Sequence, residues 1–558
     1  MIRRSDAALA AMLVMSATLL APRRMEAAPP VDPYQVGIQK LDEGEWAEAL
    51  PIYRRITAEN PAYPWGWMGL GWSLHYTGEL KAALPAYRRA LELGALPPQR
   101  VWLEIARCQA ANLQPDSALD ALDQALAAGL PRVHTLRSDR RLAALWAHPR
   151  FRAMTGWVDS ARVSRTAGWS SDLRFLRREI DRVYPVALSE RVKGQLDSAV
   201  AATERAVSRL DDDALGVRVM QLARLLGDGH SEATPPFQDG PREAALPVLF
   251  GAFDDGVFVT ATDSSHQELL WARVIAVEAV GIDAAFRRLD SVCSQDNPMR
   301  VLSVAPRQLR YPQILHALGI AARGDRVTLT LIDRTGRSRT ATLAKQPGDP
   351  ARWIRRPADA RTELPRFIRD RSQYHVLRYE RATRELVAQY NTCADADTQS
   401  VEQYAERLAR FIDSHDVERL IVDLRWNGGG DNFLNRPLLE AIVQARKVNR
   451  AGHLFVIAGR HTFSAAICFA AQLDRFTHAM FVGEPTGSSP NFVGETNPVL
   501  LPYSGVQVGV SNLAWQNSAA TDHRLWIPPR IPVPWRFADW REGRDTAMEA
   551  IRNFRVGS

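Results

Sequence analysis

A seven-residue segment near the N-terminus recurs after 34 positions with four identical residues, and this spacing limits what residues 33–132 can form. The segment Gly44–Leu50 returns as Gly78–Leu84, and a weaker third copy runs through Ser117–Leu122. A unit of this length holds two helices and a turn, and it cannot bury its apolar face alone. Three stacked units give a continuous core. The sequence therefore predicts an all-helical array over residues 33–152, closed by a helix over 136–151.

The repeated unit resembles the tetratricopeptide repeat. That resemblance implies small alanines where paired helices approach closely, and it implies that Tyr53 and Tyr87 fill the groove between them. The concave face of such an array could hold a partner protein or peptide. Alternatively, the array is a spacer that only packs on the next domain, and the sequence leaves both open.

The first residues have the pattern of an export signal. Arg3 and Arg4 precede the apolar run Ala7–Ala21, and the small residues Ala27 and Ala28 follow it. This run is shorter than the roughly 20 residues that a membrane span needs, and the combination is typical of a secretory signal. We expect a signal peptide over residues 1–28 and a periplasmic or secreted mature chain without a membrane span. An uncleaved N-terminal anchor is the alternative.

Composition excludes several classes of protein. The 558 residues are 46% hydrophobic and 24% charged, as in ordinary globular proteins, and the length suggests about three or four domains. The 70 basic residues are scattered among 63 acidic ones, whereas a nucleic-acid surface usually shows clustering. The four cysteines are too widely spaced for a metal motif. We expect buried free thiols, although export would permit disulfides.

The middle of the chain changes from helical to strand patterns. Residues 165–235 have helical periodicity that ends at Gly227–Ser231, where two glycines flank an aspartate and stop the helix. This turn places His230 on a loop. Residues 240–350 alternate as strands do and form a β-rich lobe, which loosely resembles a PDZ domain. The alternative is a lobe without a peptide groove.

Residues 370–555 alternate strands, tight turns and helices, and Ser464 begins one of these helices directly after a strand. At a helix start its hydroxyl meets the positive end of the dipole, which favours a developing anion. The amide of Ala465 and one from Gly428 or Gly429 would form an oxyanion hole, so the pattern fits acyl transfer with Ser464 as nucleophile. Taken singly, the serine is equally read as a helix cap and the glycines as an ordinary turn.

Four motifs together identify a family resemblance. Asp423–Gly430, Thr462–Ala466, Val482–Gly487 and the earlier Gly227–Ser231 resemble motifs of the tail-specific proteases, also called C-terminal-processing peptidases, and they occur in the order that this family has. The resemblance covers residues 170–555. It implies an α/β core of the crotonase-like superhelix type, with Ser464 as nucleophile.

The general base needs a separate argument. Many members of this family use a lysine that follows the serine, but no lysine follows Lys447 here. The tricorn-like branch uses a histidine from the motif that matches Gly227–Ser231, which implies His230 as base, and an acid late in the domain. Asp522 is our expectation for that acid, and a loop acid paired with Arg524 is the alternative. Arg530 and Ile467 depart from the family pattern and weaken the expectation of activity.

The sequence thus predicts an exported serine hydrolase, a peptidase acting on protein or peptide substrates, which needs no cofactor or metal. The alternatives are a non-catalytic member that binds a protein or an apolar ligand, and an esterase that uses the same residues.

Overall fold

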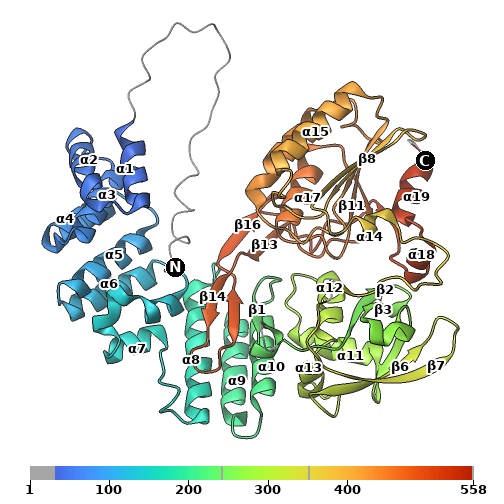
Figure 1. The fold of residues 1–558 in the computed structure, drawn as a ribbon, viewed down its shortest axis with the longest axis horizontal. Coiled ribbons are helices and arrows are strands. Elements are labelled where there is room, and N and C mark those ends of the chain that lie inside the picture. The colour runs from blue at the N-terminus through green and yellow to red at the C-terminus, as the bar shows by residue number, and fades with distance from the viewer. Residues whose placement is uncertain (1–31, 240–242, 350–351, 556–558) are drawn as a thin grey trace, which may run out of the picture. The chain divides into compact units, whose positions relative to one another are not determined.

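The computed structural model describes residues 32–239, 243–349 and 352–555 (Figure 1). The chain divides into two compact units, Met1–Val158 and Asp159–Ser558. The signal peptide expected over residues 1–28 lies outside the described residues. Among the residues described, no helix is long and apolar enough to cross a membrane.

The first unit is a helical array, as the 34-residue repeat predicts. The repeated tyrosines are buried, and they lie where a Cβ atom on Gly69 or Gly71 would meet their rings at 2.2 and 2.5 Å. The close packing of Tyr53 and Tyr87 therefore requires glycines in α3, the helix between the two that carry these tyrosines. The array consists of α1 (Pro33–Glu43), α2 (Trp46–Glu59), α3 (Pro64–Tyr76), α4 (Leu80–Glu92), α5 (Pro98–Ala111) and α6 (Pro115–Ala127).

The closing segment of this array differs from the single helix that the sequence predicts. It consists of two 3₁₀ turns, Val133–Ser138 and Arg140–Leu145, and the short helix α7 (Pro149–Thr155). Asp139 between the two turns is extended, and its side chain accepts a hydrogen bond from the Arg141 amide. A local aspartate cap thus interrupts a segment whose apolar spacing alone favours one helix.

The second unit begins with three helices, each started by a side-chain cap. They are α8 (Arg165–Val183), α9 (Glu190–Ala206) and α10 (Asp212–Arg224). Ser164, Ser189 and Asp211 accept hydrogen bonds from backbone amides of the first turns. Helix α10 leads into the Gly227–Ser231 turn.

The β-rich lobe contains the strands that the alternating pattern predicts. Its sheet has the order β2-β3-β4-β6-β7, with β5 paired to β4. The lobe also carries three helices, of which α12 begins next to the Gly227–Ser231 turn, where Asp296 contacts Gly229. The elements are β2 (Val248–Phe253), β3 (Gly256–Thr262), β4 (Arg273–Val277), β5 (Val280–Gly281), α11 (Ile282–Leu289), α12 (Pro298–Gln308), α13 (Pro312–Ala317), β6 (Arg326–Ile332) and β7 (Ser338–Ala344).

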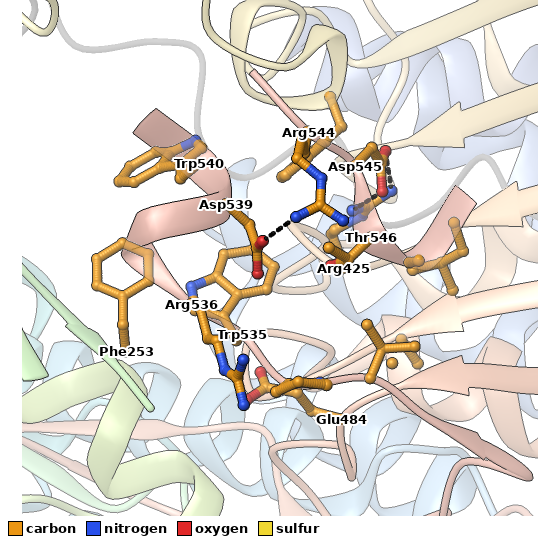
Figure 2. Close-up of a pocket in the computed structure, with 17 residues that line it drawn as sticks. Phe253, Arg425, Glu484, Trp535, Arg536, Asp539, Trp540, Arg544, Asp545 and Thr546 are labelled. Atoms are coloured by element: carbon orange, nitrogen blue, oxygen red, sulfur yellow. Dashed lines mark hydrogen bonds and ion pairs between the residues drawn. The ribbon is translucent and has the colours of Figure 1, made fainter. Parts of the chain in front are cut away.

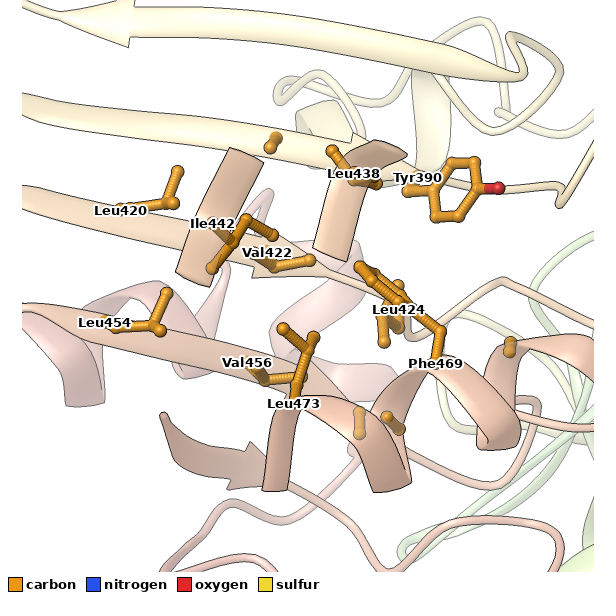
Figure 3. Packing of buried hydrophobic residues seen from close by; sticks show 14 of the residues in the cluster. Tyr390, Leu420, Val422, Leu424, Leu438, Ile442, Leu454, Val456, Phe469 and Leu473 are labelled. Atoms are coloured by element: carbon orange, nitrogen blue, oxygen red, sulfur yellow. The ribbon is translucent and has the colours of Figure 1, made fainter. Parts of the chain in front are cut away.

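The C-terminal core is a six-stranded sheet of order β17-β12-β11-β10-β9-β8, in which only the β8–β9 pair is antiparallel. Alternate residues of each central strand face opposite layers. Leu420 and Val422 pack with helices on one face (Figure 3), whereas Ile421 packs with α19 on the other. The elements are β8 (His375–Glu380), β9 (Glu385–Tyr390), α15 (Val401–Ser414), β10 (Arg419–Asp423), α16 (Asn435–Gln444), β11 (Leu454–Ala458), α17 (Ala465–Phe476), β12 (Met480–Gly483), β17 (Ile531–Pro532), α18 (Phe537–Arg541) and α19 (Thr546–Asn553).

Short antiparallel strands connect the helical segment to this core. β1 (Glu232–Thr234) follows His230 and pairs with β15 (Gln507–Val510), which also pairs with β14 (Asn497–Leu500). A second pair joins β13 (Asn491–Gly494) and β16 (Leu513–Gln516). The pairing of β1 with β15 holds the chain just after the Gly227–Ser231 turn, and His230 of this turn contacts Ser464 at the start of α17.

The junction of the two units gives the first prediction. Residues 157–164, between α7 and α8, form no helix or strand. Brief proteolysis of the folded protein should cut here first and release two fragments, because loop backbone fits a protease more readily than helix backbone. Mass spectrometry of the fragments locates the cut. An uncut junction, with cleavage first inside α3 or α10, would contradict two independent units.

Candidate active site

Ser464 stands at the junction of β11 and α17 in a strained backbone conformation. Its φ of 55° and ψ of −128° lie in a region that serine rarely adopts. Although Ser464 occupies the position before the helix, its side chain does not cap the helix amides. The hydroxyl is therefore directed elsewhere, and the alternative of an ordinary helix cap does not fit this geometry.

The glycine loop after β10 lies directly against Ser464. Gly429 has a φ of +107°, and a Cβ atom there would come within 2.6 Å of the Ser464 Cβ. The Gly429 amide donates to Asn427 Oδ1 at 2.9 Å, whereas no hydrogen bond to the amides of Gly428 or Ala465 is found in the described part of the chain. Of the two loop amides that the sequence proposes for an oxyanion hole, the geometry favours Gly428.

His230 lies beside the serine, 234 residues away in the sequence. Its Nε2 atom and Ser464 Oγ are 2.9 Å apart, which is hydrogen-bond distance. The structure thus brings together the two residues that the sequence proposes as base and nucleophile.

Aromatic rings enclose the imidazole. Phe463 and Phe492 stack on it with centroid separations of 4.4 and 5.3 Å. Burial in this sandwich lowers the pKa of His230 to about 4, while the Asp228 charge acts in the opposite direction. The imidazole is therefore neutral at pH 7, which is the form that accepts a proton.

The turn that carries His230 is held by two carboxylates that sequence reasoning missed. Asp228 accepts hydrogen bonds from the amides of His230 and Ser231, at 2.9 and 2.6 Å, and from Ser511 Oγ at 2.7 Å. Asp296 of the β-rich lobe accepts from the Gly229 amide at 2.9 Å, and burial raises its pKa to about 6. The acidic residue between the glycines was visible in the motif, but no local signal marks Asp296.

Asp522 does not join the pair. Its carboxylate accepts hydrogen bonds from Arg524 at 2.8–3.1 Å, which is the alternative that the sequence left open. His230 Nδ1 is buried, and within the described residues no carboxylate hydrogen-bonds it. The expectation that Asp522 orients the imidazole therefore finds no contact in this geometry.

His461, the histidine nearest to Ser464 in sequence, points into another environment. Its Nδ1 atom lies 2.7 Å from Ser303 Oγ, and its ring stacks on Trp426. Burial lowers its pKa well below the usual range. It serves as a matched control for His230.

A separate small pocket lies at the carboxyl ends of β11 and β12 (Figure 2). Its three carboxylates are all paired with arginines. Asp545 pairs with Arg425, Asp539 with Arg544, and Glu484 with Arg460. Neither Ser464 nor His230 lines it. These paired charges indicate a structural network, so the pocket is not the candidate site.

All four cysteines are buried free thiols, as expected.

Comparisons with known proteins give structural neighbours only. No protein-family model matches the chain, and no curated protein matches it. Mature CPAF in complex with lactacystin is 15% identical with a TM-score of 0.48, covering 69% of this chain and 98% of that one. The photosystem II D1 C-terminal processing protease is 12% identical with a TM-score of 0.36, covering 70% and 97%. The tricorn protease is 13% identical with a TM-score of 0.34, covering 70% and 37%.

The second of these neighbours is named a C-terminal processing protease, which is the family whose motifs this sequence resembles. The chemistry of the site follows from its motifs and geometry.

The glycine loop gives a prediction with an internal control. Gly429→Ala should destabilise the fold by about 2 kcal/mol or more, because the new methyl group meets Ser464 and the residue has a positive φ. Gly428→Ala should cost less than about 1 kcal/mol, since a Cβ atom there meets nothing within 4 Å. Urea denaturation of both variants measures the difference. Equal stabilities would contradict the close approach of the loop to Ser464.

Proposed function

We propose that this chain is an exported serine peptidase of the tail-specific protease family, acting through Ser464 with His230 as general base. The observation that carries the proposal is the 2.9 Å contact between His230 Nε2 and the uncapped hydroxyl of a strained serine. The repeat array, which we take to be of the tetratricopeptide type, is proposed to bind a protein partner. Export rests on the N-terminal signal pattern.

In the proposed reaction, neutral His230 accepts the proton of Ser464 Oγ as the oxygen attacks a substrate carbonyl carbon. Negative charge then develops on the carbonyl oxygen. The Ala465 amide at the positive end of α17, together with the Gly428 amide, stabilises that charge. His230 next donates its proton to the leaving amine. Water then attacks the acyl-enzyme carbonyl while His230 accepts its proton, and His230 returns that proton to Ser464 Oγ as the carboxylic acid product leaves.

One observation favours the alternative of a non-catalytic binding protein. A carboxylate commonly orients the base of a serine–histidine pair, and His230 Nδ1 has none among the residues described. The aromatic sandwich supplies an alternative means of fixing the ring, so the peptidase remains our proposal.

Covalent labelling tests the nucleophile and the base together. Wild-type protein should react with a fluorophosphonate probe at Ser464, and Ser464→Ala should abolish labelling. His230→Ala should slow labelling by at least about a hundredfold, the usual scale of losing a general base. Peptide mapping locates the adduct, and the labelling rate gives the effect.

His461→Ala is the control for that experiment and should slow labelling far less, because His461 contacts Ser303 rather than Ser464. Unchanged labelling of His230→Ala would refute the serine–histidine mechanism. A wild-type protein that does not label at all would support the non-catalytic alternative.

The buried imidazole gives a pH prediction. Since the pKa of His230 lies near 4, the base stays unprotonated and the labelling rate should change little between pH 8 and pH 5.5. An imidazole with its ordinary pKa of about 6.5 would lose half of its activity near that pH. Phe492→Ala exposes the ring and should move the midpoint upward toward that value. A wild-type midpoint of 6.5 would contradict the aromatic sandwich.

A further inference from the structure

An arginine that the reaction does not use lies next to the candidate site. Arg300, on α12, places its Cζ atom 3.7 Å from the centroid of the Phe463 ring. The imidazole of His230 stacks on the same ring at 4.4 Å. Two groups this close to one centroid cannot share a face, so Phe463 separates the guanidinium from the imidazole. Phe463 directly precedes Ser464.

Arg300 has no partner for its charge. Its Nε atom is buried without a hydrogen bond, and no hydrogen bond or ion pair to the rest of the guanidinium is found within residues 32–239, 243–349 and 352–555. Burial lowers its pKa, and the nearby carboxylates of Glu232 and Asp296 act in the opposite direction without reaching ion-pair distance. Among the residues described, the guanidinium is thus a half-buried cation without an ion-pair partner, and its terminal nitrogens are free to bind an anionic ligand.

Stacking on Phe463 also determines how Arg300 would bind a ligand. The ring occupies a face of the guanidinium, whereas all five N–H donors point outward in its plane. A carboxylate meets such a plane edge-on with two parallel hydrogen bonds.

The surroundings favour an anion over a cation. A second arginine, Arg371, lies with its Cζ atom 4.0 Å from the ring centroid of Trp426, two residues before Gly428. Arg371 is exposed, and no ion pair involving it is found in the described segments. Arg460 is also near, but Glu484 neutralises it. Each of the two loops that form the candidate site thus carries an aromatic ring with an unpaired arginine on it.

We infer that the site accepts peptides with a carboxylate close to the scissile bond, and that Arg300 binds this carboxylate. The inference names the substrate class of the proposed peptidase and therefore rests on that function. The carboxylate belongs to an acidic side chain of the substrate.

Binding to the Ser464→Ala variant tests this inference without requiring catalysis. Two pools of dye-labelled, amidated peptides are compared, identical except for Glu or Gln at one fixed position. Fluorescence anisotropy should show about 10- to 100-fold tighter binding of the Glu pool, as expected for a charge-assisted bidentate contact. A Gln pool with a free C-terminus is the third arm, and tighter binding of that pool instead of the Glu pool would contradict an acidic side chain as the ligand.

Substitutions of Arg300 assign the preference to its side chain. Adding Arg300→Gln should bring the ratio between the pools close to one. Arg300→Lys should reduce it only in part, because lysine keeps the charge and loses the fork. Arg407→Gln is the matched control. This arginine also lies over an aromatic ring, Tyr404 of α15, at 5.6 Å, and its loss should leave the ratio unchanged.

Equal binding of all three pools would overturn the inference, as would a preference that survives both Arg300 substitutions. Each ratio comes from a single preparation, so partial misfolding of a variant cancels. If Arg300→Gln does not fold, an undiminished ratio in Arg300→Lys still overturns the inference. Failure of the wild type to label or cleave would count against the proposed function, and the binding ratios would remain decisive for Arg300.

Discussion

The candidate site depends on holding one short turn against the start of one helix. His230 and Ser464 are 234 residues apart, so no local interaction can bring them together. Asp228 fixes the turn from within through backbone amides, and pairing of β1 with β15 fixes the chain that follows. Because backbone groups are buried at both points, a shift of the turn would leave several donors unsatisfied. The position of the imidazole follows from these contacts.

The same constraint makes the β-rich lobe part of the site. Asp296 and Arg300 both come from the lobe, and each contacts a residue adjacent to the pair. The buried Arg460 binds the lobe to the core, since it donates to the Ala252 carbonyl at 2.8 Å and pairs with Glu484 of the core. A buried arginine that loses one of these partners is strongly destabilising. The lobe therefore acts as a wall of the site, whether or not it also binds peptides as a PDZ domain does.

Periodicity was sufficient for most elements, because each is specified by its own segment. The strand at Leu420–Leu424 and the helix from Ala465 follow from alternating or helical apolar spacing, and the structure has both. Ser464 was visible as a residue between them. The base was predicted only through the family resemblance. The expected role of Asp522 finds no contact because its carboxylate pairs with Arg524, two residues away. The contacts of Asp296 and Arg300 join segments far apart in the sequence, so no local pattern predicts them.

The environment of His230 determines which interactions must stabilise the transition state of the proposed reaction. Burial keeps the imidazole neutral but also makes it a weak base, and a base far below the working pH gains little from proton transfer. The imidazolium that forms has no carboxylate on Nδ1 in the described structure, so only the more distant Asp228 charge and the Val493 backbone favour the charged ring. The developing oxyanion is then the nearest compensating charge. In the proposed mechanism, stabilisation of this charge by the amides of Ala465 and Gly428 would supply the larger share of the rate enhancement. The strained backbone of Ser464 fits this requirement, because its side chain leaves the first amides of α17 uncapped, and the Ala465 amide has no hydrogen-bond partner among the described residues.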